Sequence, residues 1–152
     1  MGDKERLFEV SLVREGAYRS ISAALEAVER CVPDETVPVR VLVAPGEYRE
    51  RVEIRRSHVT IEGETADSVR IVGDLGAKMP SGDGSGQDGM LGTFRTYTML
   101  VDADDVTLAN LTIENDAGNG REVGQAIALY ADGDRLVVDA CRILGHQDTL
   151  FA

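Results

Sequence analysis

The sequence predicts an all-β protein folded as a parallel β-helix, a solenoid of short stacked strands, with one capping helix near its N-terminus. Three observations predict it. From Val37 onward the chain consists of short runs of Val, Ile, Leu and Thr broken by Gly, Asp and Asn, two segments repeat each other, and only one segment has helical periodicity. With 152 residues, of which 5% are aromatic, the chain fits one domain with an aliphatic core.

The helix is expected at residues 20–30. Its apolar residues recur at the spacing i, i+3, i+4 and i+7: Ile21, Ala24, Leu25 and Val28. Ser20 is available as the N-cap and Pro33 stops the run. A helix at this end of a solenoid covers strand edges that would otherwise pair with other chains.

Four strands are expected next, in residues 37–43, 51–54, 58–63 and 69–73. Residues 99–115 and 128–145 then share an apolar run, an acidic turn and a double apolar stretch. Aligning Thr107-Leu108 with Val137-Val138 gives an offset of 30 residues, and residues 58–63 form a weaker copy. Such repeats indicate coils that bury their apolar faces by stacking on one another.

A β-sandwich is the alternative fold. Its hairpin signals would be the Asp-Gly pairs at 83–84, 88–89 and 132–133. The first two fall in a Gly-, Ser- and Asp-rich loop, residues 76–92, which is either a functional insertion beside a site or a tolerated one.

The charge balance excludes one class of partner. Sixteen basic and 27 acidic residues give a net charge of -11, so no basic face is available for nucleic acid. The N-terminus lacks an apolar signal-peptide region and no long apolar run follows, which predicts a cytoplasmic protein with no membrane partner. Cys31 and Cys141 lack disulfide-framework or metal-ligand spacing and are expected to be ordinary buried thiols.

Three stretches combine Gly with polar groups between apolar strands: residues 92–98, 124–129 and 145–150. Gln125 and Gln147 are 22 residues apart, about one coil, so their amides are expected to be neighbours. Two amides beside the carboxyl of Asp148 suit acyl chemistry, in which amide N–H groups hold an oxyanion and the acid moves a proton. On spacing alone, a polar turn between strands explains residues 147–149 better.

Several motifs, taken in order, favour the catalytic interpretation over a polar turn, because together they resemble the pectinesterases, or pectin methylesterases. The motifs are GTF (92–94), LTIENDAG (111–118), GQAIAL (124–129) and CRILGHQDTL (141–150), preceded by YRSISAAL (18–25), VAPGEYRE (43–50) and VTIEG (59–63). The resemblance runs from about residue 9 to the last residue. It implies a right-handed parallel β-helix that hydrolyses methyl esters of polygalacturonate without metal or cofactor.

By this resemblance, Asp148 is the general acid and then base, and Gln125 and Gln147 are the oxyanion and substrate amides. Thr93 falls on a position that touches the sugar, and Phe94 lies alongside it. The partners implied are pectin or oligogalacturonide methyl esters. Residues 1–152 would form the N-terminal part of the catalytic domain, truncated at the C-terminal end, in a family whose members are often extracellular.

The departures from the family pattern matter as well. The family's nucleophilic Asp lies about one coil beyond QDTL, and its substrate-binding Arg and Trp lie further on; the 152 residues contain neither motif. We therefore assign no nucleophile, and neither Asp116 nor Asp139 is given that role. We expect the chain alone to be inactive. His146 stands where the family commonly has an aromatic residue and is expected at the groove rim. The apolar strand 149–151, without a polar capping coil, predicts self-association.

Two other functions stay open at this level. A β-solenoid that binds pectic oligosaccharide without turnover fits the same sequence. A pectate lyase is a weaker alternative, since that chemistry usually needs Ca²⁺ held by clustered carboxylates, and no such cluster has convincing spacing.

Overall fold

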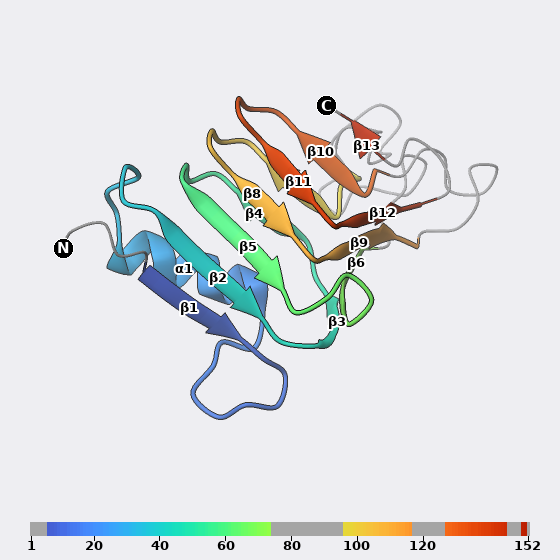
Figure 1. Ribbon diagram of the computed structural model, residues 1–152, viewed down its shortest axis with the longest axis horizontal. Coiled ribbons are helices and arrows are strands. Elements are labelled where there is room, and N and C mark those ends of the chain that lie inside the picture. Colours follow the sequence, from blue (N-terminus) through green and yellow to red (C-terminus); the bar gives the residue numbers. More distant parts are fainter. Residues whose placement is uncertain (1–5, 74–95, 117–126, 146–149, 152) are drawn as a thin grey trace, which may run out of the picture.

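Parallel strands stacked in coils, with one helix at the N-terminal end, make up the computed structural model, which describes residues 6–73, 96–116, 127–145 and 150–151 (Figure 1). The elements are β1 (Arg6–Val10), α1 (Ile21–Cys31), β2 (Val39–Val43), β3 (Gly46–Arg49), β4 (Val52–Ile54), β5 (Val59–Gly63), β6 (Val69–Gly73), β7 (Met99–Val101), β8 (Thr107–Ala109), β9 (Thr112–Asn115), β10 (Leu129–Ala131), β11 (Val137–Asp139), β12 (Arg142–Leu144) and β13 (Leu150–Phe151).

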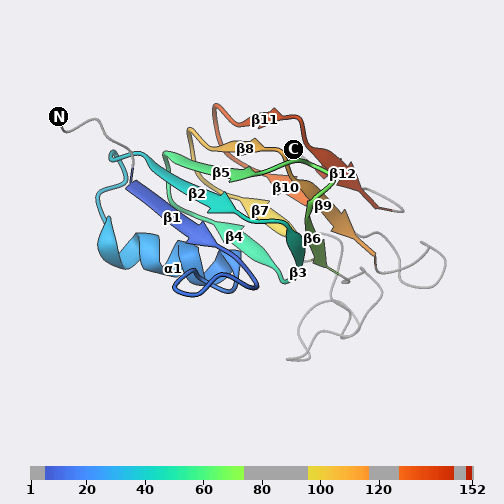
Figure 2. The ribbon, with the colours of Figure 1, turned by 60° about the horizontal axis from the view of Figure 1, so that its bottom comes forward.

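The strands form three sheets. From β2 onward each coil contributes one strand to each sheet, and β1 adds a fifth strand to one of them. Sheet A has the order β1-β2-β5-β8-β11, sheet B the order β12-β9-β6-β3, and sheet C the order β13-β10-β7-β4. The chain visits the sheets in the cycle C, A, B, as Figures 1 and 2 show for β4-β5-β6, β7-β8-β9 and β10-β11-β12. The predicted parallel β-helix is confirmed.

The pairing register confirms the internal repeat. Val137 pairs with Thr107 and Val138 with Leu108, which is the predicted offset of 30 residues. Residues 58–63 also stack as expected, because Thr60 pairs with Thr107. All pairings between named strands are parallel in the described part of the chain, so the β-sandwich alternative is wrong. The Asp132-Gly133 pair lies in a turn that stacks closely on the turn of the preceding coil. A Cβ on Gly133 would lie 2.0 Å from the carbonyl oxygen of Ala103.

Helix α1 closes the N-terminal end of the stack. Ser20 caps it as predicted, with its Oγ accepting the Ala23 amide at 3.0 Å. Glu50 adds a second cap, since its carboxylate accepts the amides of Ile21 and Ser22 at 3.0 and 2.9 Å. The helix packs against β1, β2 and β4, while β1 still forms the edge of sheet A. Within the described residues, no helix is long and apolar enough to span a membrane.

Alternate residues of the strands fill the core between the sheets. In β2 and β5, every second residue is buried while the residues between them are partly exposed. The largest fully buried side chains include Tyr48, Ile61, Ile71, Met99 and Leu108. The core is therefore mainly aliphatic, as the composition predicted.

Several local predictions were wrong or incomplete. Strands β1 and β3 were not expected, and β2 begins at Val39 rather than at residue 37, after Pro38, which has no amide to donate. Cys31 is exposed instead of buried because it is the last residue of α1, and Val32 enters the core in its place. Cys141 is half-buried, which raises the pKa of its thiol.

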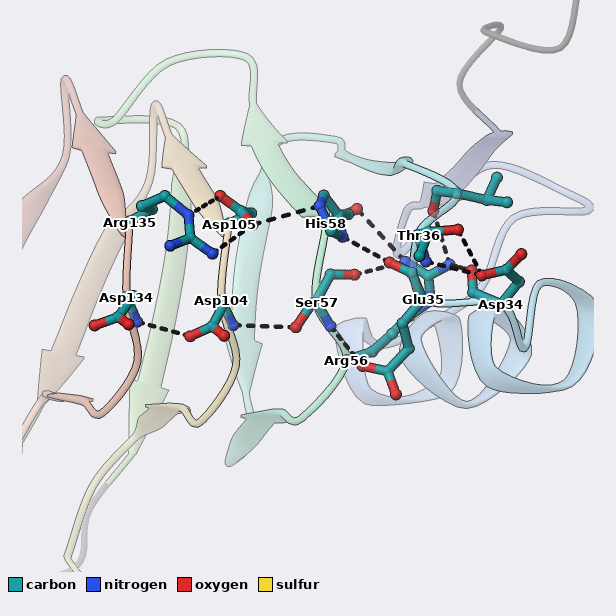
Figure 3. Close-up of polar contacts among 11 residues, drawn as sticks. Asp34, Glu35, Thr36, Arg56, Ser57, His58, Asp104, Asp105, Asp134 and Arg135 are labelled. Carbon is teal, nitrogen blue, oxygen red and sulfur yellow. Dashed lines mark hydrogen bonds and ion pairs between the residues drawn. The ribbon is translucent and has the colours of Figure 1, made fainter.

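The turns from sheet C to sheet A stack in two polar rows (Figure 3). In one row, Ser57 Oγ accepts the Asp104 amide at 3.1 Å and Asp104 Oδ1 accepts the Asp134 amide at 2.8 Å. In the other row, His58, Asp105 and Arg135 all have a positive φ, of 60°, 56° and 60°. The Arg135 guanidinium donates to both oxygens of Asp105, at 2.6 and 3.0 Å. These three residues have a backbone conformation that glycine adopts most easily. Contacts between the side chains of neighbouring coils accompany it here.

Asp105 makes the stability of this turn dependent on pH. The hydrogen bond from Arg135 lowers the pKa of the Asp105 carboxyl below its ordinary value. Its contribution to stability is therefore present above the unfolded-state pKa, about 3.9, and is lost as pH falls through the folded-state pKa. We expect Asp105→Asn to lower the thermal midpoint at pH 7 and to have little effect near pH 2. Asp132→Asn, at an exposed position in the equivalent turn of the next coil, is the control; equal effects of Asp105→Asn at both pH values would contradict the assignment.

The last coil exposes apolar side chains. Val137, Leu144 and Leu150 are 51%, 43% and 56% exposed. The self-association expected from the sequence stays a prediction.

Candidate functional site

The residues predicted to take part in catalysis or substrate binding all belong to segments that connect the same two sheets. Thr93, Phe94, Gln125, Gln147 and Asp148 lie in the three segments that link a strand of sheet B to the next strand of sheet C. All of them, with His146 and the loop 76–92, lie outside the described residues. All three segments therefore connect the same two sheets, and where these residues lie relative to one another stays a prediction.

The strands that these motifs lead into are neighbours. Strand β10 lies between β7 and β13, with Leu129 paired to Met99 on one side and to Leu150 on the other. The chain enters all three strands from the same end, because the pairing is parallel. The β10–β13 register corresponds to 21 residues, within one residue of the 22 that separate Gln125 from Gln147.

The outer face of sheet C carries a row of paired residues. Glu53 of β4 pairs with Leu100 of β7, which pairs with Tyr130 of β10. Met99 and Val101, on either side of Leu100, point into the main core, so this row points away from it. Tyr97, Leu100 and Ile127 form a second, separate apolar cluster on this face, with Tyr130 packed against it.

Tyr97 connects this cluster to charged groups. Its ring meets Tyr130 edge-on, with centroids 6.3 Å apart at 79°. The Arg51 guanidinium lies over the Tyr97 ring, 3.9 Å from its centroid, and the phenol donates to Glu53 Oε1 at 2.8 Å. Arg55 also donates to Glu53, at 2.9 Å.

These contacts fix the charge state of Glu53 and Tyr97. Burial raises the pKa of Glu53, but hydrogen bonds from Tyr97 and Arg55 outweigh it, so the net pKa is lowered. Burial, together with the hydrogen bond to Glu53, raises the pKa of Tyr97. At neutral pH the pair is a carboxylate and a neutral phenol, which can accept and donate hydrogen bonds respectively.

A groove of about 290 Å³ begins beside this pair, between α1 and β4. Its lining residues are Ser22, Leu25, Glu26, Glu29, Arg51, Glu53 and Arg55. The groove therefore meets the row on sheet C at Glu53, and Arg51 lines it as well. A second groove, of about 300 Å³, lies by the C-terminal ends of β1, β2 and β5, away from sheet C.

Sequence reasoning missed the tyrosines and the groove. The chain has four Tyr, three Phe and no Trp, so two tyrosines near short strands of one sheet were the signal that could have pointed to an aromatic pair there. In the described part of the chain, no three His, Cys, Asp or Glu side chains come together in a way that could hold a metal ion.

Comparison with known proteins gives one consistent result. The pectinesterase family model matches residues 9–152. A probable pectinesterase/pectinesterase inhibitor of Arabidopsis thaliana, number 23, is 35% identical over 138 residues, which cover 90% of this chain and 22% of that protein. A pectinesterase of Petunia integrifolia is 33% identical over 144 residues, 93% of this chain and 34% of that protein.

Solved structures agree with the sequence relatives. A pectin methylesterase crystallised with a hexasaccharide superposes with a TM-score of 0.86 at 26% identity, over 97% of this chain and 46% of that one. The pectin methylesterase of Yersinia enterocolitica gives a TM-score of 0.77 at 33% identity, over 87% and 43%. The chain thus spans less than half the length of each of these relatives.

Proposed function

This chain belongs to the pectinesterase family, and we propose that it provides the N-terminal part of a site that removes methyl esters from polygalacturonate and releases methanol. The in-register pairing of β10 with β13 carries the proposal. It makes neighbours of the strands that follow GQAIAL and QDTL, the two motifs in which the amides and the acid occur.

In the proposed reaction, a carboxylate attacks the ester carbonyl carbon, and the amides of Gln125 and Gln147 stabilise the oxyanion that forms. Asp148 gives its proton to the departing methanol. Water then attacks the acyl-enzyme, Asp148 takes a proton from that water as general base, and the nucleophilic carboxylate leaves. By family resemblance the nucleophile comes from a motif beyond QDTL, which these 152 residues do not include.

The outer face of sheet C supports a polysaccharide substrate. Tyr130 is partly exposed on that face and packs against the buried Tyr97, Glu53 and the arginines offer hydrogen bonds, and the groove extends this face past β4. Adjacent strands are about 4.8 Å apart, so a chain of sugars lying across the sheet would meet several strands. A net charge of -11 favours an esterified, nearly neutral substrate and the release of its carboxylate product.

Methanol release tests the proposal. A protein in which this chain is followed by the downstream family motifs is expected to release methanol from highly esterified pectin, measured with a coupled oxidase, and the chain alone to fall short of it by more than about tenfold. Binding of methyl-esterified oligogalacturonide without any methanol release would favour a non-catalytic solenoid. Activity of the chain alone within about tenfold would mean that a carboxylate already present is the nucleophile.

A further inference from the structure

The groove between α1 and β4 has two walls of different chemistry. The helix contributes residues at the spacing i, i+3, i+4 and i+7, which share one face: Ser22, Leu25, Glu26 and Glu29. The strand and its flanking positions contribute every second residue, which again share one face: Arg51, Glu53 and Arg55. The volume of about 290 Å³ is at the lower end of the range for small-molecule sites, so the groove suits a short segment of a polymer chain.

The charged groups of the strand wall already have partners. Arg55 donates to Glu53 at 2.9 Å and pairs with Asp102 at 3.2 Å. The Tyr97 phenol donates to the other oxygen of Glu53, at 2.8 Å, and the Arg51 guanidinium lies over the Tyr97 ring. The positive charges on this wall are therefore largely compensated by groups of the wall itself.

The helix wall has the opposite character. Glu26 and Glu29 are exposed, and no hydrogen bond or ion pair joins either carboxylate to another residue in the described part of the chain. Leu25, beside them on the same face, is partly buried and packs against the main core. This wall therefore presents two uncompensated negative charges next to an apolar side chain.

We propose that this groove binds a methyl-esterified galacturonate unit and disfavours a unit with a free carboxylate. The inference rests on the proposed function, because it names the ester state of the same substrate class. The carboxylates of Glu26 and Glu29 can accept hydrogen bonds from sugar hydroxyls of either form, and Leu25 offers an apolar contact to a methyl ester. A free carboxylate of the sugar would instead meet two like charges. In water, one like charge about 4 Å away weakens binding by a factor of about five.

A double substitution removes these charges without removing the groove. Glu26→Gln combined with Glu29→Gln keeps the side-chain shape and an acceptor oxygen at each position. Glutamine is about as good a helix former as glutamate, so α1 should stay intact, which circular dichroism checks. The matched control is Glu62→Gln combined with Glu64→Gln. Those two residues line the second groove, so the control changes the net charge by the same amount elsewhere.

Isothermal titration calorimetry with the 152-residue chain tests the inference. The ligands are oligogalacturonides of equal length, one fully methyl-esterified and one fully de-esterified. The unaltered chain is expected to bind the esterified form about fivefold more tightly or better, and raised salt should shrink this preference because exposed charges are screened. The variant without Glu26 and Glu29 should bind the de-esterified form about fivefold more tightly, with unchanged affinity for the esterified form. The control should keep the original preference.

Three results would overturn the inference. They are a preference that survives the loss of Glu26 and Glu29, an equal change in the control variant, and no binding of either oligosaccharide. The test is separate from that of the proposed function, because it measures binding rather than methanol release. Absence of methanol release by the protein that carries the downstream motifs would overturn the proposed esterase, whichever oligosaccharide the groove binds. Methanol release with an unchanged preference in the double variant would overturn only the role of the groove.

Discussion

Replacing Asp148 by Asn in the protein that carries the downstream motifs is expected to lower kcat by about 10²–10⁴-fold, the usual contribution of a general acid or base. Asparagine has the same shape as aspartate but cannot give a proton to departing methanol or take one from water. Gln125→Ala is expected to cost about 10²–10³-fold, because it removes one oxyanion donor. Both losses should appear in kcat, with an unchanged circular dichroism spectrum.

Asp139→Asn provides the control for this experiment. Asp139 is an exposed residue of β11 with no assigned role, so its replacement should leave kcat unchanged. Near-native turnover by Asp148→Asn or Gln125→Ala, with the fold intact, would show that other residues carry out the chemistry.

The second large effect is expected at Arg56, which is only 4% exposed (Figure 3). Its guanidinium donates to backbone carbonyls on both sides of it. The acceptors are the carbonyl oxygens of Val32 at 3.2 Å, Asp34 at 2.6 Å, Val37 at 2.8 Å and Ser57 at 2.7 Å. Burial lowers the pKa of Arg56, although arginine still keeps its charge at neutral pH. Arg56 thus fixes the segment that joins α1 to β2 against the turn after β4.

Arg56→Met is expected to lower the free energy of unfolding by about 3 kcal/mol or more, because each buried carbonyl left without a donor costs about 1–3 kcal/mol. Chemical denaturation measures this loss. Arg55→Met is the control. The guanidinium of Arg55 is half exposed and pairs with Glu53 and Asp102, so its loss should cost less than about 1 kcal/mol. Equal losses in the two variants would contradict the role given to Arg56.

Arg56 also illustrates what sequence patterns do not reveal. Two adjacent arginines look alike in the sequence, yet one is exposed and the other buried, because only the stacked coils bring the carbonyls of residues 32–37 around one of them. The repeat at 99–115 and 128–145 was predictable because its apolar pattern recurs. Strand β3 was not, since Tyr48 is the only fully buried side chain in a polar run.

The candidate site also has features that could be predicted from the sequence and features that could not. The motifs that carry Gln125 and Asp148 were predictable from their order in the sequence, and the register of sheet C gives them neighbouring strands. The small cluster of Tyr97, Leu100 and Ile127 outside the main core was not predictable, because alternation separates two faces of a strand without saying which face of MLV (99–101) meets the core. That choice depends on the neighbouring coils.

The three turns from sheet C to sheet A in the described part of the chain span the same number of register positions. From Ile54 to Thr60, from Val101 to Thr107 and from Ala131 to Val137, the chain advances six positions each time. The connections from sheet B to sheet C instead shorten from residues 74–98 to 116–128 and then to 145–149. Insertions and deletions at that corner leave the strand register intact. Evolution can therefore lengthen, shorten or replace the segments that carry the GTF, GQAIAL and QDTL motifs while the strands on either side stay paired in the same register.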